Sequence, residues 1–137
     1  MEYYLYRTLI TLLLSECGGQ TLSDLIFYEN SKGCSPVKDL ISKLDNSQQP
    51  SDISLLKKIF FRFDIFEELN TRAPKEYVEH IQEGIWQIRI GRWRIFFFHW
   101  EKDKYVLLHP FMKKTQQTPI REIEQAKREK NDWLNRH

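Results

Sequence analysis

Residues 85–111, IWQIRIGRWRIFFFHWEKDKYVLLHPF, decide the fold, because they contain three runs rich in β-branched and aromatic residues. These runs predict strands at Ile85–Ile90, Trp93–Trp100 and Tyr105–Phe111. Only Gly91-Arg92 separates the first two runs, and Gly at the first central position is typical of a type II′ hairpin. The polar residues 101–104 separate the second run from the third. The stretch therefore predicts a three-strand antiparallel meander.

The segments around the meander carry helix signals. Ser35-Pro36, Pro50-Ser51-Asp52 and Thr118-Pro119 each combine a capping residue or a Pro with an apolar stripe at helical spacing. A strand is expected within Leu22–Glu29, where β-branched and aromatic residues again gather. The expected elements are, in order, that strand, helices at 36–46 and 50–70, a short strand at 77–81, the meander, and a helix at 120–133.

This order predicts an α+β fold: a mainly antiparallel twisted sheet, with the helices packed on one of its faces. A chain of 137 residues forms one domain, which we place at residues 22–137, with residues 1–21 as an N-terminal extension. The apolar run at 3–14 is too short to span a bilayer and lacks the flanks of a signal peptide. We expect it to form an additional packing helix or strand.

The distribution of charge, the two cysteines and the four histidines indicate which partners and ligands the protein could have. Residues 1–70 carry a net charge of −3 and residues 71–137 a net charge of +5, and within 87–121 eight basic residues face two acidic ones. Such a basic surface fits a polyanionic partner. Cys17 and Cys34 form no CxxC motif, which is typical of free thiols in a reducing cytoplasm. The four histidines lack the spacing of a zinc site, so we expect no metal and no cofactor.

The hairpin register sorts the side chains of the meander onto two faces. Pairing across the two-residue loop places Arg89 opposite Arg94, and pairing of Trp100 with Tyr105 would place Arg94 opposite Phe111. One face then collects Gln87, Arg89, Arg94, Phe96, His109 and Phe111. The other is the predicted core, with Trp86, Ile88, Ile90, Trp93, Ile95, Phe97, Val106 and Leu108.

Several of these residues have two possible roles. Opposed arginines are unfavourable in isolation, so Arg89 and Arg94 either lean apart into water or hold an anion between them. His109 is either a hydrogen-bonded structural residue or a group that takes part in chemistry. Phe96, Phe98 and Trp100 also have two possible roles. They either form a second small core under the last helix or provide surfaces on which RNA bases stack.

Four segments resemble the phage-derived, HigB-like branch of the RelE/ParE toxin superfamily: IFYENSKGCSPVKDLISKLD (26–45), GIWQIRI (84–90), WRIFFF (93–98) and LLHPFMKKTQQTPIREIEQAKRE (107–129). The likeness covers nearly all of residues 22–134, and KKTQ-TP-REIE-A is its most specific part. The resemblance implies a RelE-like fold and the toxin of a type II toxin–antitoxin pair. Such a toxin is a metal-independent endoribonuclease that cleaves mRNA in the ribosomal A site by attack of the RNA's own 2′-hydroxyl. Its partners would be the ribosome, mRNA and a helix-turn-helix antitoxin, all in the cytoplasm and away from any membrane.

The same resemblance assigns roles to individual residues. Arg94 takes the position that contacts the scissile phosphate, and Arg89 the cationic position one strand back. His109 would be a general acid or base or a base-edge contact, and Lys113 a basic catalytic residue after the last strand. The residues expected to bind RNA are Arg92, Phe96, Phe111, Lys114 and Gln87.

A second class of function is compatible with these residues. The superfamily lineage also contains toxins that inhibit DNA gyrase by binding it, and inactive remnants in prophages. In a non-catalytic protein of this kind, the cations would hold an acidic protein segment as an added helix or strand.

Overall fold

A computed structural model of the chain describes residues 21–22 and 25–137. The elements are β1 (Thr21–Leu22), β2 (Leu25–Phe27), α2 (Pro36–Asp45), α3 (Pro50–Leu69), the short 3₁₀ helix η1 (Asn70–Arg72), β3 (Val78–Gln82), β4 (Ile85–Ile90), β5 (Trp93–His99), β6 (Tyr105–Met112) and α4 (Ile120–Arg136). The predicted N-terminal extension, including the packing element expected at 3–14, lies outside the described residues. No helix among those described is both long and apolar enough to cross a membrane.

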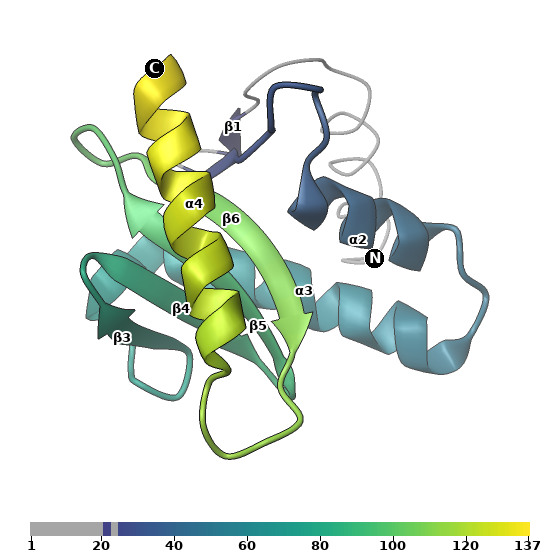
Figure 1. The fold of residues 1–137 in the computed structure, drawn as a ribbon. Coiled ribbons are helices and arrows are strands. Elements are labelled where there is room, and N and C mark those ends of the chain that lie inside the picture. Colours follow the sequence, from purple (N-terminus) through teal and green to yellow (C-terminus); the bar gives the residue numbers. More distant parts are fainter. Residues whose placement is uncertain (1–20, 23–24) are drawn as a thin grey trace.

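The six strands form one sheet in the order β1-β2-β6-β5-β4-β3 (Figure 1). Only β2 and β6 run parallel, and the other neighbours are antiparallel. The α+β class and the mainly antiparallel sheet are therefore confirmed. The two helix starts predicted first are also correct: Ser35 caps α2 through its side chain, which accepts a hydrogen bond from Lys38 N at 3.4 Å, and α3 begins at Pro50.

The prediction that the helices pack on one face of the sheet is wrong. Helices α2 and α3 cover one face, where Phe66 packs edge-on against Phe97 with ring centroids 4.7 Å apart. Helix α4 crosses the opposite face (Figure 1) and packs against Phe96 and Phe98. The reason lies in β5, where consecutive residues 95–98 are all apolar and fully buried. A strand that is apolar on both faces needs a cover on both.

The register of the β4–β5 hairpin agrees with the prediction. Ile90 pairs with Trp93, and Arg89 pairs with Arg94. Gly91 has a φ of +58°, while Arg92 is not among the residues with positive φ, as a type II′ turn requires. Because L side chains rarely adopt this φ, the turn depends on glycine at this position.

The β5–β6 pairing differs from the prediction near its turn. Arg94 faces Phe111 as expected, but the register shifts between Ile95 and Phe97, so that His99 rather than Trp100 pairs with Tyr105. An irregularity of this kind changes which face the following residues occupy. Val106 and Leu108, predicted to share a core with Ile95 and Phe97, therefore lie on the other face under α4.

His109 joins α4 to the sheet. Its ring is 3% exposed and lies between two carboxylates, with Nδ1 2.6 Å from Glu129 Oε1 and Nε2 2.8 Å from Glu122 Oε2. Burial alone lowers the pKa of His109, but the hydrogen bonds and charges of Glu129 and Glu122 outweigh burial, so the pKa lies above its ordinary value. Protonation lets both ring nitrogens donate at once, and the resulting imidazolium binds strand β6 to helix α4.

Replacement of His109 by Gln should lower the free energy of unfolding by about 3 kcal/mol at pH 5.5, because two partly buried carboxylates lose their cation. Since the folded-state pKa is raised, the stabilisation from this ring is complete below its ordinary pKa and is lost as the pH rises through the folded-state value. Urea unfolding at pH 5.5 and pH 9 should therefore show a smaller difference between His109→Gln and the wild type at the higher pH.

His80→Gln is the matched control, because His80 is exposed and its ring contacts Trp86 among the described residues. It should leave the unfolding curves unchanged at both pH values. An equal deficit of His109→Gln at pH 5.5 and pH 9 would show that the charge of the imidazole does not hold α4.

Candidate functional site

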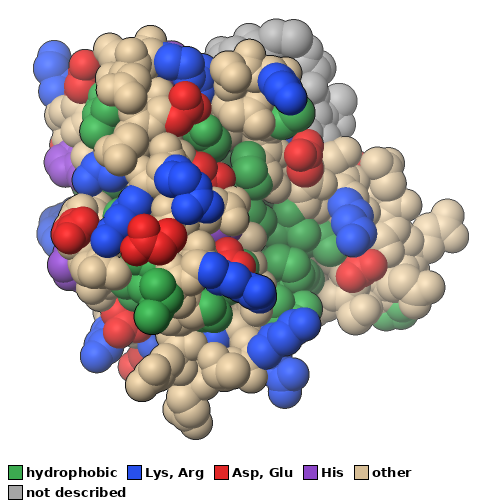
Figure 2. Space-filling view, in the orientation of Figure 1, with side chains coloured by type: hydrophobic (Ala, Val, Ile, Leu, Met, Phe, Trp, Pro, Cys, Tyr) green, Lys and Arg blue, Asp and Glu red, His purple; other side chains and the backbone are tan. Residues whose placement is uncertain are grey.

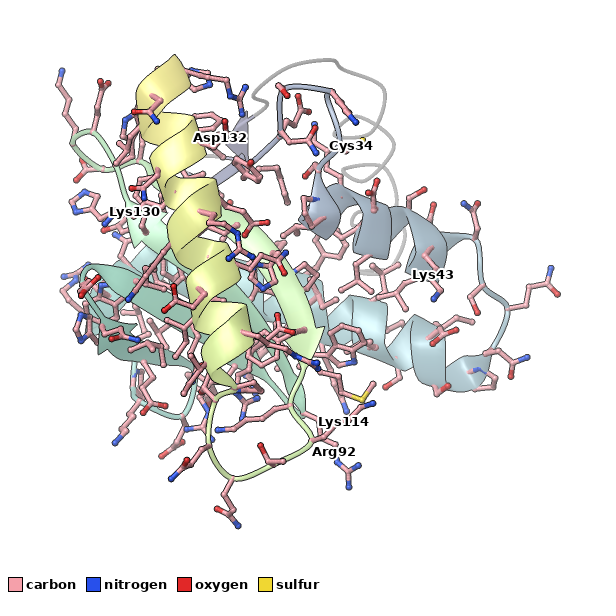
Figure 3. All side chains as sticks on the ribbon, in the orientation of Figure 1. Cys34, Lys43, Arg92, Lys114, Lys130 and Asp132 are labelled. Atoms are coloured by element: carbon pink, nitrogen blue, oxygen red, sulfur yellow. The ribbon has the colours of Figure 1, made fainter. Side chains whose placement is uncertain are left out.

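A groove at the end of the β4–β5 hairpin gathers five cationic side chains. Its volume is about 570 Å³, and it is lined by Arg89, Gly91, Arg92, Arg94, Lys113, Lys114, Thr115 and Gln116. We call it the cationic groove. Figure 2 shows Lys and Arg side chains gathered at the lower end of the molecule, where Figure 3 places Arg92 and Lys114. The structure thus brings together all five basic residues that the sequence assigned to the site.

Arg94 is the anchored member of the groove. The residue is 6% exposed, and Nη1 donates to the carbonyl oxygens of Gly91 at 2.6 Å and Trp93 at 2.9 Å. Burial, followed by the charge of Arg89, lowers the pKa of Arg94 from its ordinary value. Of the two roles open for the arginine pair, a solvated side chain therefore does not describe Arg94, which is buried and bound to backbone carbonyls.

Arg89 also lines the groove, where it lies close to a carboxylate. Its Nη1 lies 3.6 Å from Glu79 Oε2, and Glu79 also accepts a hydrogen bond from Gln87 Nε2 at 3.3 Å. Sequence reasoning missed Glu79, which does not line the groove but lies next to Arg89. The signal was available, because alternation along the predicted strand at 77–81 and its pairing with β4 place Glu79 opposite Gln87.

Lys113 lies directly after the end of β6 and lines the groove. Its backbone N donates to Arg92 O at 2.8 Å, which ties the end of β6 to the β4–β5 turn. Burial, followed by the charges of Arg94 and Arg89, lowers the pKa of Lys113. An ammonium group with a lowered pKa both attracts an anion and exchanges a proton more readily than an ordinary lysine.

Four predicted site residues do not line the cationic groove. Phe96 is fully buried, Gln87 is 1% exposed and Phe111 is 8% exposed, so none of the three presents a surface on which an RNA base could bind. Phe96 belongs with Phe98 to the small core under α4, as the alternative interpretation proposed. Both ring nitrogens of His109 are bound to carboxylates, which corrects its assignment as general acid or base to a structural role.

The groove offers positive charge rather than ligands for a metal. Among residues 21–22 and 25–137, no group of three His, Cys, Asp or Glu side chains could hold a metal ion. Two guanidinium groups and an ammonium group that face one open space suit the oxygens of a phosphate. The site can therefore bind a phosphodiester and stabilise additional negative charge on it.

Comparison with known proteins gives a family. No curated protein matches the chain significantly. The family model described as "Phage derived protein Gp49-like" matches residues 40–131, which include β3–β6, the cationic groove and most of α4. Membership of this family is consistent with a toxin of a toxin–antitoxin pair. The match covers more than half of the chain, which therefore belongs to the phage-derived, Gp49-like family.

Proposed function

We propose that this protein is the toxin of a type II toxin–antitoxin pair and cleaves mRNA in the ribosomal A site without a metal ion. The observation that carries the proposal is the convergence of Arg89, Arg94 and Lys113 on one groove. The groove is lined by five basic side chains and by no acidic one, so it keeps an excess of positive charge. A helix-turn-helix antitoxin would neutralise the protein in the cytoplasm.

The chemistry requires little beyond this charge. The 2′-hydroxyl oxygen attacks the adjacent phosphorus, the bond to the 5′-oxygen breaks, and the products are a 2′,3′-cyclic phosphate and a 5′-hydroxyl. Negative charge grows on the phosphoryl oxygens in the transition state, where Arg94 and Arg89 would stabilise it. One proton leaves the 2′-oxygen and one reaches the leaving 5′-oxygen. Lys113, with its lowered pKa, is the residue of the groove suited to transfer one of them.

A second candidate function is binding without catalysis. The groove has no histidine and no carboxylate among its lining residues, so it offers no conventional general base. This favours a protein that holds an acidic segment of a target, as in gyrase inhibition, or an inactive prophage remnant.

Induction of the protein in a bacterial host should separate these functions. We expect protein synthesis, followed by pulse labelling, to fall before DNA synthesis, and mapped mRNA 5′ ends to show new cuts within codons. Arg89→Ala should remove the cuts, while Lys102→Ala, in the exposed β5–β6 turn, should leave them. A fall in DNA synthesis first, or no fall in either, would place the protein in the non-catalytic class.

The variants Lys113→Arg and Lys113→Ala distinguish two possible roles of Lys113 in cleavage: stabilisation of negative charge and transfer of a proton. If Lys113 transfers a proton, both variants should slow cleavage on ribosomes by about 10²–10⁴-fold, because arginine keeps the charge but does not release a proton. Single-turnover cleavage of ribosome-bound mRNA measures the rate. Full activity of Lys113→Arg alongside an inactive Lys113→Ala would restrict the residue to electrostatic stabilisation.

Arg89→Ala should also change how RNA binding depends on salt. Loss of one phosphate contact should reduce the slope of log affinity against log salt concentration by about 0.7 for a single strand. Fluorescence anisotropy of a labelled RNA oligonucleotide provides the measurement, with Lys102→Ala as the control. An unchanged slope would mean that Arg89 contacts no phosphate.

A further inference from the structure

A second groove lies on the other side of the β4–β5 turn, between that turn and helices α2 and α3. Its volume is about 480 Å³, and we call it the apolar groove. The apolar side chains that line it are Leu40, Leu44, Leu55, Ile90, Trp93 and Met112. Neither the fold nor the proposed cleavage reaction explains it.

Met112 is the clearest sign of an open surface, because 44% of it is exposed although it ends a central strand. Leu40 and Leu55 are only partly buried as well, at the edge of the core that α2 and α3 form with the sheet. Apolar side chains left open on facing elements suit an apolar side chain supplied from outside.

The rim of the apolar groove is basic. Lys43 on α2, Lys58 on α3 and Arg92 at the turn line it, and all three are exposed. None of their side chains forms an ion pair with another described residue. Figure 3 shows Lys43 on α2 and Arg92 near the lower end of the sheet. Asp52, the one acidic lining residue, is hydrogen-bonded to Ser47 at 2.6 Å.

We propose that the apolar groove binds an amphipathic helix with acidic flanks, supplied by a partner protein. An apolar stripe would fill the space between α2, α3 and the turn, and the acidic flanks would face Lys43, Lys58 and Arg92. Gly91 and Arg92 line both grooves, so a helix bound here lies beside the cationic groove. The proposal does not depend on cleavage activity.

Two other occupants fit less well. RNA would find a single aromatic ring, that of Trp93, and this ring is partly buried against the α2–α3 core. A second copy of the chain would have to supply an acidic helix, but the described helices α2, α3 and α4 carry net charges of 0, −1 and +1.

Selection of short random peptides displayed on phage, with the full chain as bait, tests the proposal. The enriched peptides should combine apolar residues at helical spacing with Asp or Glu beside them. The tightest one, made synthetically with a fluorescent label, should bind Lys43→Glu/Lys58→Glu and Met112→Glu at least about tenfold more weakly than the wild type. The control Lys32→Glu/Lys102→Glu makes the same change of charge at exposed positions outside both grooves and should bind as the wild type does.

The proposal would be overturned if no peptide were enriched, if a selected peptide bound all variants equally, or if sedimentation showed a dimer that Lys43→Glu/Lys58→Glu dissociates. A loss of affinity for a labelled single-stranded RNA in Lys43→Glu/Lys58→Glu as large as that in Arg89→Ala would assign the groove to nucleic acid instead. Absence of mRNA cleavage would defeat the proposed function but leave this test unaffected.

Discussion

The two-residue turn at Gly91-Arg92 is the constraint on which the rest of the structure depends. With Gly91 at positive φ, the turn sets Arg89 opposite Arg94, and the alternation along both strands follows from that pairing. A slip of one residue would exchange the faces of β5, moving Arg94 toward the α2–α3 core and Ile95 toward α4. The same turn supplies the carbonyl oxygens that hold Arg94 and Lys113, so it organises the core and the cationic groove together.

A buried arginine beside a second arginine is costly unless its donors are used. In this structure Arg94 Nη1 donates to the carbonyls of Gly91 and Trp93, whereas its buried Nε has no hydrogen-bond partner among the described residues. Glu79 lies 3.6 Å from Arg89 Nη1. Backbone dipoles stabilise the guanidinium without neutralising it. The groove therefore keeps a net positive charge, and the bound position of Arg94 would reduce the reorganisation needed for the phosphate binding that we propose.

Sequence reasoning succeeded where local patterns decide the structure. Gly91, Ser35-Pro36 and Pro50 set a turn and two helix starts by their own backbone preferences, and the structure agrees at each. It failed where distant segments decide. The register shift between Ile95 and Phe97 moves Val106 and Leu108 to the other face. Pro110, which pairs with Ile95 beside the shift and cannot donate to a strand ladder, marks a possible irregularity but does not give the new register. The burial of His109 depends on Glu122 and Glu129, which only the docking of α4 brings to the ring.

The segment 113–129 shows why motif and function must be separated residue by residue. Its first part, Lys113 to Gln116, lines the cationic groove. Its later part supplies Glu122 and Glu129, which bind His109 and fix α4 on the sheet. A sequence resemblance in this segment can therefore reflect residues that attach α4 to the sheet as well as residues that line the cationic groove. The residues that line one groove, Arg89, Arg94 and Lys113 above all, are those through which the proposed reaction would act, because one phosphate could contact all three.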